Sequence, residues 1–181
     1  MATPKVKIAM IIAFRNFRDE EYFIPKEIFL AAGFDVSTMS SEKGIAIGGS
    51  GGEVEIDISF EDFNISKFDA VVFVGGPGAY KYIDDQSVWQ IAREVVRQDK
   101  ILAAICISPV ILARAGVLEG KKTTVWSSVM DKKPIHILEE NGAEYQDKAV
   151  VQDGKIITAN GPSSAQEFAE TIIKTIETKP Q

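Results

Sequence analysis

Apolar and polar residues follow two different patterns along this chain. Three short runs are almost entirely apolar, and each has the length of a strand buried on both faces of a parallel sheet. They cover residues 8–13, 70–74 and 101–105. Apolar side chains at helical spacing predict amphipathic helices. These helices cover residues 20–32, 85–98 and 165–177. The alternation of strands and helices predicts a parallel-sheet α/β/α sandwich with ligands at the carboxyl edge of the sheet.

Shorter elements complete this sandwich. Strands are predicted at residues 34–39 and 123–126, a helix at 134–140, and a hairpin around Asp153-Gly154. In the loop of residues 14–19, Asp19 is a candidate N-cap for the helix that follows. The glycine-rich stretch 44–52 lacks the Lys-Ser/Thr pair of a phosphate loop, and an alternating strand follows it instead of a helix. We interpret it as a flexible connection.

Size and charge limit the classes of function. The 181 residues suffice for one domain, predicted to span 1–181. The net charge of −6, with acidic and basic residues mixed, argues against nucleic acid or an anionic membrane as partner. No apolar run has the roughly 20 residues that a membrane span needs, and the start of the chain does not resemble a signal peptide.

Cysteine and histidine usage bounds the chemistry further. A single cysteine cannot form an internal disulfide, so we expect a reducing, cytoplasmic compartment. A Cys/His zinc site within one chain is implausible with one residue of each type. We therefore expect no metal and no cofactor.

Cys106 lies where the period changes from strand to helix. Ser108 can cap the next helix and Pro109 fits its first position. A side chain on such a turn projects from the carboxyl edge and faces the positive end of the helix, which favours thiolate over thiol. This is the setting of a nucleophile elbow. The alternative is a small buried side chain, as many free cysteines are.

Partners for a reactive sulfur can come from the same edge of the sheet. Glycines 75, 76 and 78 follow a buried strand, so that backbone amides there could hold an oxyanion or simply form a tight turn. Three carboxylates open the helix after the first strand. They are Asp19, Glu20 and Glu21, and each is either a catalytic group or a solvated charge favoured at a helix start. His136 lies on a later helix, away from this edge, so that a Cys-His dyad within the chain is not expected.

Taken together, four segments make the chain resemble the ThiJ/PfpI (DJ-1/PfpI) superfamily, which shares its sheet with class I glutamine amidotransferase domains. They are residues 19–25, 68–78, 104–118 and 151–162. The resemblance implies a flavodoxin-like α/β/α fold, and homodimers or higher homo-oligomers. The stretches 44–52 and 58–60 are more similar to the PfpI-type intracellular proteases than to the deglycase branch.

The resemblance also assigns roles to residues. It implies that Cys106 is the nucleophile, that Glu21 hydrogen-bonds its sulfur, and that the amides of Gly75 and Ile107 line an oxyanion pocket. Gly76 contributes backbone to the same site, and Trp126 and Ser108 line the pocket. Two histidines of the family are replaced here: Ile107 follows the nucleophile, and Trp126 matches the histidine position of the deglycase branch.

These substitutions decide between hypotheses about function. Peptide hydrolysis needs one group that acts as base and then as acid, normally a histidine. We therefore expect a glyoxalase- or deglycase-like enzyme in which Cys106 attacks a small reactive carbonyl and Glu21 shuttles the proton. One alternative is a PfpI-type cysteine peptidase or amidohydrolase completed by His136 of a neighbouring subunit. Another is a non-enzymatic redox sensor in which Cys106 is oxidised to a sulfinic acid.

Overall fold

A seven-stranded sheet forms the centre of the computed structural model, which describes residues 4–178; residues 1–3 and 179–181 of the predicted domain lie outside the described residues. The strand order is β11-β12-β8-β7-β1-β3-β6. Their bounds are β1 Lys7–Ile11, β3 Asp35–Ser40, β6 Ile58–Ser59, β7 Ala70–Phe73, β8 Ile101–Ile105, β11 Val150–Asp153 and β12 Ile156–Ala159. Every pair of neighbours is parallel except the β11–β12 hairpin. The predicted fold class is confirmed.

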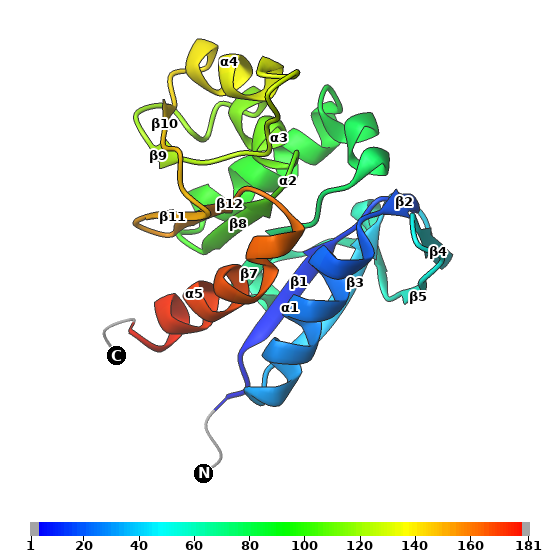
Figure 1. The fold of residues 1–181 in the computed structure, drawn as a ribbon. Coiled ribbons are helices and arrows are strands. Elements are labelled where there is room, and N and C mark those ends of the chain that lie inside the picture. Colours follow the sequence, from blue (N-terminus) through cyan, green and yellow to red (C-terminus); the bar gives the residue numbers. More distant parts are fainter. Residues whose placement is uncertain (1–3, 179–181) are drawn as a thin grey trace.

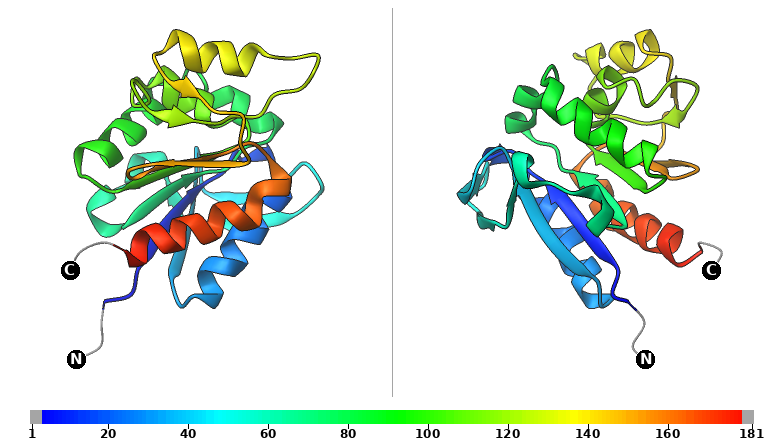
Figure 2. Two further views of the ribbon diagram at one scale, coloured as in Figure 1. Left: turned by 60° about the vertical axis from the view of Figure 1, so that its left-hand side comes forward. Right: turned by 180° about the vertical axis from the view of Figure 1, so that it is seen from behind.

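The helices form two layers, one on each face of this sheet (Figures 1 and 2). Helices α1 (Asp19–Ala31) and α5 (Ala165–Glu177) lie side by side on one face. Helices α2 (Gln86–Arg97) and α3 (Pro109–Arg114) cover the other, with α4 (Lys133–Glu140) packed against α3. Strands β1, β7 and β8 are therefore covered on both faces, and from Ile8 onwards their residues are buried. This explains their continuous apolar runs.

Several helix boundaries follow from local sequence signals. Helix α2 starts after Asp85, whose carboxylate accepts a hydrogen bond from the Ser87 amide at 2.8 Å. Helix α1 runs through Pro25 and is closed by Gly33, which has a φ of +82°. Helix α5 has the predicted bounds 165–177. None of the helices in the described part of the chain is long and apolar enough to cross a membrane.

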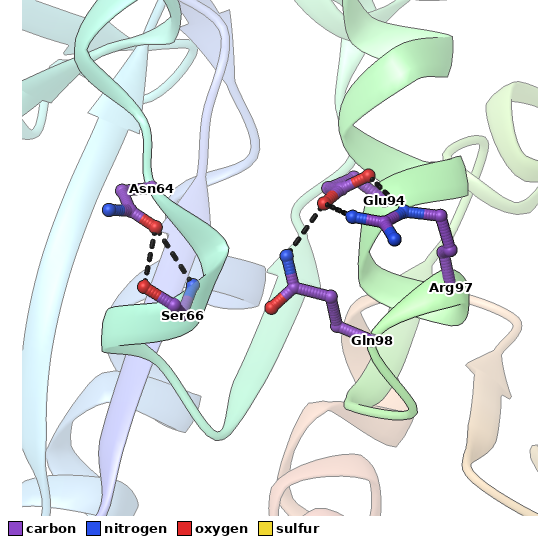
Figure 3. A network of polar contacts seen from close by, with 5 residues as sticks. All are labelled: Asn64, Ser66, Glu94, Arg97 and Gln98. Carbon is purple, nitrogen blue, oxygen red and sulfur yellow. Dashed lines mark hydrogen bonds and ion pairs between the residues drawn. The ribbon is translucent and has the colours of Figure 1, made fainter.

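Short 3₁₀ helices connect the strands on the α2 side. They are η1 Phe60–Asp62, η2 Ile65–Lys67, η3 Pro77–Tyr82 and, before α5, η4 Pro162–Ser164. Figure 3 shows Asn64 capping η2 by accepting hydrogen bonds from the amide and hydroxyl of Ser66. It also shows Glu94, near the end of α2, held by Arg97 and Gln98. These local contacts lie away from the carboxyl edge of the sheet.

The glycine-rich stretch is ordered, contrary to the flexible connection that we expected. It forms β4 (Gly44–Gly48) and the tight turn that leads into β5 (Glu53–Ile56), and β4 also pairs with β2 (Arg15–Phe17) at one end of the molecule (Figure 1). Asp19 holds the turn, because its carboxylate accepts hydrogen bonds from the amides of Ser50 and Gly52, both at 2.8 Å. Asp19 is thus the first residue of α1 and not its N-cap, which is Arg18.

The strand expected at residues 123–126 is shorter than predicted. Strand β9 covers Lys122–Thr123 and pairs with β10 (Glu144–Tyr145). Beyond it the backbone finds other partners: the Thr124 amide donates to the Thr158 hydroxyl, and the Trp126 amide donates to the carbonyl of Cys106. The segment therefore leaves the small sheet and crosses to the carboxyl end of β8.

Candidate active site

Cys106 lies at the turn between β8 (Ile101–Ile105) and the helix that follows it, where the sequence predicts a change from strand to helix. It directly follows β8 and has a φ of +64°, a left-handed conformation that is unfavourable for any residue except glycine. Two hydrogen bonds of 2.9 Å hold this conformation. The Cys106 amide donates to the carbonyl of Ala159 at the end of β12, and the Cys106 carbonyl accepts from Trp126. The thiol is thereby fixed at the carboxyl edge, where it is partly exposed.

Ser108 does not have either of the roles expected for it. It occupies the N-cap position of α3, but its hydroxyl makes no capping bond. Instead the fully buried Oγ donates to the carbonyl of Val74 at 2.8 Å. Ser108 therefore ties the elbow to the end of β7 beneath the site and does not line a pocket.

Glu21 comes to the sulfur from the first turn of α1. Its side chain is fully buried, and Oε2 accepts a hydrogen bond from the Gly75 amide at 2.9 Å. The carboxyl group also hydrogen-bonds the Cys106 thiol. Its other oxygen, Oε1, is buried with no conventional donor among the described residues. Such an oxygen is where a proton is most easily held, because a buried carboxylate oxygen without a donor is costly.

The two neighbouring carboxylates point elsewhere. Asp19 holds the turn between β4 and β5, as described above. Glu20 is exposed and pairs with Arg18 at 3.1 Å. Of the three acidic candidates, only Glu21 reaches the sulfur.

Burial controls the protonation of this pair. It raises the pKa of Glu21 from 4.5 to about 7, although the contacts with Cys106, the Gly75 amide and the charge of Arg18 act in the other direction. Burial, together with the Glu21 carboxylate, also raises the pKa of the Cys106 thiol. The amides of Ile107 and Gly76 oppose this by hydrogen-bonding the sulfur. Burial and the Glu21 carboxylate thus oppose the thiolate that the strand-to-helix turn was expected to favour, and they hold the pKa of the thiol above its usual value.

In the glycine turn after β7, other groups of the site lie so close to the backbone of Gly75 that a side chain there has no room. A Cβ on Gly75 would lie 2.7 Å from the Cβ of Cys106 and 2.7 Å from Oε2 of Glu21. Its amide is engaged by Glu21, so Gly75 is not the oxyanion donor that we expected. The amides of Gly76 and Ile107 approach the sulfur instead. Gly76 has a φ of +107°, which favours glycine there.

A pocket of about 250 Å³ opens above the sulfur. It is lined by Arg18, Gly76, Pro77, Tyr80, Cys106, Ile107 and Trp126. The expected positions of Gly76, Ile107 and Trp126 at the site are thus observed. Arg18 and Tyr80 were not foreseen, although both lie in connections that follow β strands at the carboxyl edge, which is the signal that could have found them.

His136 lies outside this pocket. It is on α4 with two thirds of its side chain exposed, and Nδ1 is 3.8 Å from a carboxylate oxygen of Glu139. Within residues 4–178, no three His, Cys, Asp or Glu side chains cluster closely enough to hold a metal ion. The site thus consists of one thiol, one buried carboxyl group and a ring of backbone amides and donor side chains.

The sequence and the fold of this chain have counterparts in known proteins. The model of the DJ-1/PfpI family matches residues 6–175. The chain belongs to the DJ-1/PfpI family. The solved structure of a ThiJ/PfpI domain protein from Brachyspira murdochii superposes with a TM-score of 0.92 at 34% identity, covering 98% of this chain and 100% of that one.

Curated relatives of this DJ-1/PfpI protein span most of its length. The uncharacterized protein MJ0967 of Methanocaldococcus jannaschii is 38% identical, over 94% of this chain and 82% of its own. Deglycase PfpI of Pyrococcus furiosus is 29% identical, over 93% of this chain and 98% of its own. Glutathione-independent glyoxalase DJR-1.2 of Caenorhabditis elegans is 27% identical, over 87% of this chain and 81% of its own. The family thus includes proteins named as enzymes of carbonyl chemistry.

Proposed function

We propose that this DJ-1/PfpI protein is a cofactor-independent thiol enzyme that acts on small reactive carbonyls such as 2-oxoaldehydes. The observation that carries the proposal is the pairing of a partly exposed sulfur at Cys106 with a fully buried carboxyl group at Glu21. The sulfur can reach a molecule in the pocket, whereas Glu21 is shielded from bulk water. A proton can therefore pass between the pair and a bound substrate without exchange with solvent.

The reaction can be written with these groups alone. The Cys106 sulfur adds to the aldehyde carbon, its proton passes through Glu21 to the carbonyl oxygen, and a hemithioacetal forms. Glu21 then takes the proton from this carbon and returns it to the neighbouring keto carbon, while the hydroxyl proton of the hemithioacetal moves to the keto oxygen, so that a 2-hydroxy thioester forms. Water cleaves the thioester and frees the thiol. The sum is R–CO–CHO + H₂O → R–CHOH–COOH, so the aldehyde carbon is oxidised and the keto carbon reduced.

Backbone amides supply the charge stabilisation. Negative charge would develop on the former carbonyl oxygen next to the sulfur, and the amides of Gly76 and Ile107, which interact with the sulfur, are the donors we propose for it. The deglycase and glyoxalase names of two relatives support carbonyl chemistry. The lining of the pocket supports it too, since no imidazole from the described residues lies there to serve peptide hydrolysis.

The test is conversion of methylglyoxal to lactate by the purified protein. We expect Cys106→Ser to lower kcat/KM about a thousandfold or more, because the nucleophile is lost. Glu21→Gln should lower it by about 10²- to 10⁴-fold, because the amide cannot shuttle protons. His136→Ala, on the exposed face of α4, is the control and should retain wild-type activity. Absence of lactate with the wild-type protein, or equal activity after Cys106→Ser, would show that the proposal is wrong.

A further inference from the structure

The side chains that line the pocket around Cys106 share one property. Arg18, Tyr80 and Trp126 each bring a hydrogen-bond donor, and the guanidinium and the indole N–H have no acceptor capacity. No residue of the described chain accepts a hydrogen bond from the Trp126 indole within hydrogen-bonding distance. The wall of the pocket is thus suited to a ligand that is rich in acceptor oxygens.

Arg18 adds a positive charge to this wall. Its charge acts on Glu21, which places the guanidinium near the reacting pair. Within residues 4–178 its ion-pair partner is Glu20, which meets Nε at 3.1 Å, and both side chains are nearly half exposed. Exposed pairs of this kind contribute little free energy. The guanidinium has further N–H donors on its two Nη atoms, so an incoming carboxylate can bind without displacing a strong interaction.

The acidic groups near the pocket do not line it, whereas the Arg18 guanidinium does, so Arg18 supplies the charge that a bound ligand meets. Asp131 acts on the Tyr80 hydroxyl but is not part of the lining, and Glu21 lies buried beneath the sulfur. Among the residues that line the pocket, Arg18 carries the positive charge and none carries a carboxylate. An anionic group on the substrate would therefore meet donors and one guanidinium.

We propose that the pocket selects 2-oxoaldehydes that carry a carboxylate, which binds to Arg18 while the aldehyde carbon meets Cys106. The inference rests on the proposed function and names its substrate class. The chemistry at the reacting carbons is the one written above, and the carboxylate is a handle that takes no part in bond making. Arg18 is thus a residue that determines specificity.

The test compares two substrates that differ in charge and by one methyl group: 4,5-dioxopentanoate and its methyl ester. We expect the wild-type protein to prefer the acid over the ester in kcat/KM by about tenfold to a hundredfold, the range of a hydrogen-bonded charge pair. Arg18→Gln should abolish the preference, and Arg18→Lys should retain part of it. The readout is the ratio of the two substrates, because losing the charge beside Glu21 can also alter the rate with either one.

The variants can be interpreted because the structural contact of Arg18 is made by its main chain. Its amide donates to the carbonyl of Gly75 at 3.0 Å, and a new side chain leaves this bond in place. Arg97→Gln is the matched control, since it removes the same charge from an exposed site on α2 and should keep the preference. Turnover of both substrates without a preference, or a preference that survives Arg18→Gln, would overturn the inference and leave the proposed function intact. Failure to turn over any 2-oxoaldehyde would reject both.

Discussion

The ionisation of the buried Glu21 carboxyl group is coupled to folding. Burial raises its pKa from 4.5 to about 7, so the folded protein keeps a proton on Glu21 at pH values where the unfolded chain has lost it. Where the folded state binds more protons, the free energy of unfolding falls as the pH rises. The contribution of Glu21 is therefore complete below about pH 4.5, falls between pH 4.5 and 7, and is constant above.

This gives a prediction for stability. Relative to Glu21→Gln, which does not titrate, the wild-type protein should lose about 3 kcal/mol between pH 4.5 and 8. Urea unfolding of both proteins at pH 4.5, 6 and 8 measures the difference. Parallel pH profiles would mean that Glu21 titrates in the folded protein as it does in the unfolded chain.

Gly75 tests how closely the site is packed. Gly75→Ala would push a methyl group against Cys106, Glu21 and the carbonyl of Ile105, all at 2.7 to 2.8 Å. We expect it to destabilise the protein by about 1–3 kcal/mol and to displace Cys106 and Glu21, so that the proposed activity falls as well. In Gly49→Ala the added Cβ would meet only the carbonyl of Phe17 at an ordinary 3.7 Å, which makes it the control. Equal unfolding free energies for the two variants would contradict the packing argument.

At the scale of elements, the turn between β4 and β5 depends on a carboxylate thirty residues earlier in the chain. Asp19→Ala removes the acceptor for the amides of Ser50 and Gly52. We expect a loss of about 1–3 kcal/mol and faster hydrogen exchange at these two amides. Glu20→Ala, beside it on the exposed side of α1, should change neither. Unchanged hydrogen exchange at the amides of Ser50 and Gly52 after Asp19→Ala would show that the turn is stable without the Asp19 carboxylate.

The same turn shows which features a sequence can reveal. The buried strands, the strand-to-helix turn at Cys106 and the β11–β12 hairpin depend on signals within a few residues, and these elements match the prediction. Three acidic residues, Asp19, Glu20 and Glu21, look equivalent in the local sequence pattern. Which one faces the sulfur is decided by how α1 packs against the glycine turn, and a local pattern does not contain that information. Ser108 was misplaced for a similar reason: its acceptor, Val74, directly follows a different strand, β7. A local sequence pattern does not predict which distant residue a polar side chain hydrogen-bonds, and the wrong predictions at Asp19 and Ser108 are of this kind.

At the scale of the whole molecule, the parallel sheet gathers the site from distant parts of the chain. Strands β1, β7 and β8 end at the same edge of the sheet, and this brings together residues 18–21, 75–80, 106–107 and 126. These central strands are covered by helices on both faces, whereas the β4–β5 hairpin alternates between exposed and buried residues.

This difference predicts a hierarchy of protection. We expect the amides of β1, β7 and β8 to exchange with solvent only on global unfolding, and those of β4 and β5 through smaller openings. Native-state hydrogen exchange in low denaturant measures both. Equal opening free energies would show that the small sheet and the large one unfold as one cooperative unit.

The left-handed backbone at Cys106 lowers the free energy of unfolding, and this cost accompanies the placement of the thiol at the pocket. Any side chain with a Cβ pays for that conformation, by roughly 1–2 kcal/mol, while glycine adopts it without penalty. A Cys106→Gly protein should therefore tolerate more denaturant than Cys106→Ala, although both lack the thiol. At this position, the most stable protein would thus be one that lacks the thiol.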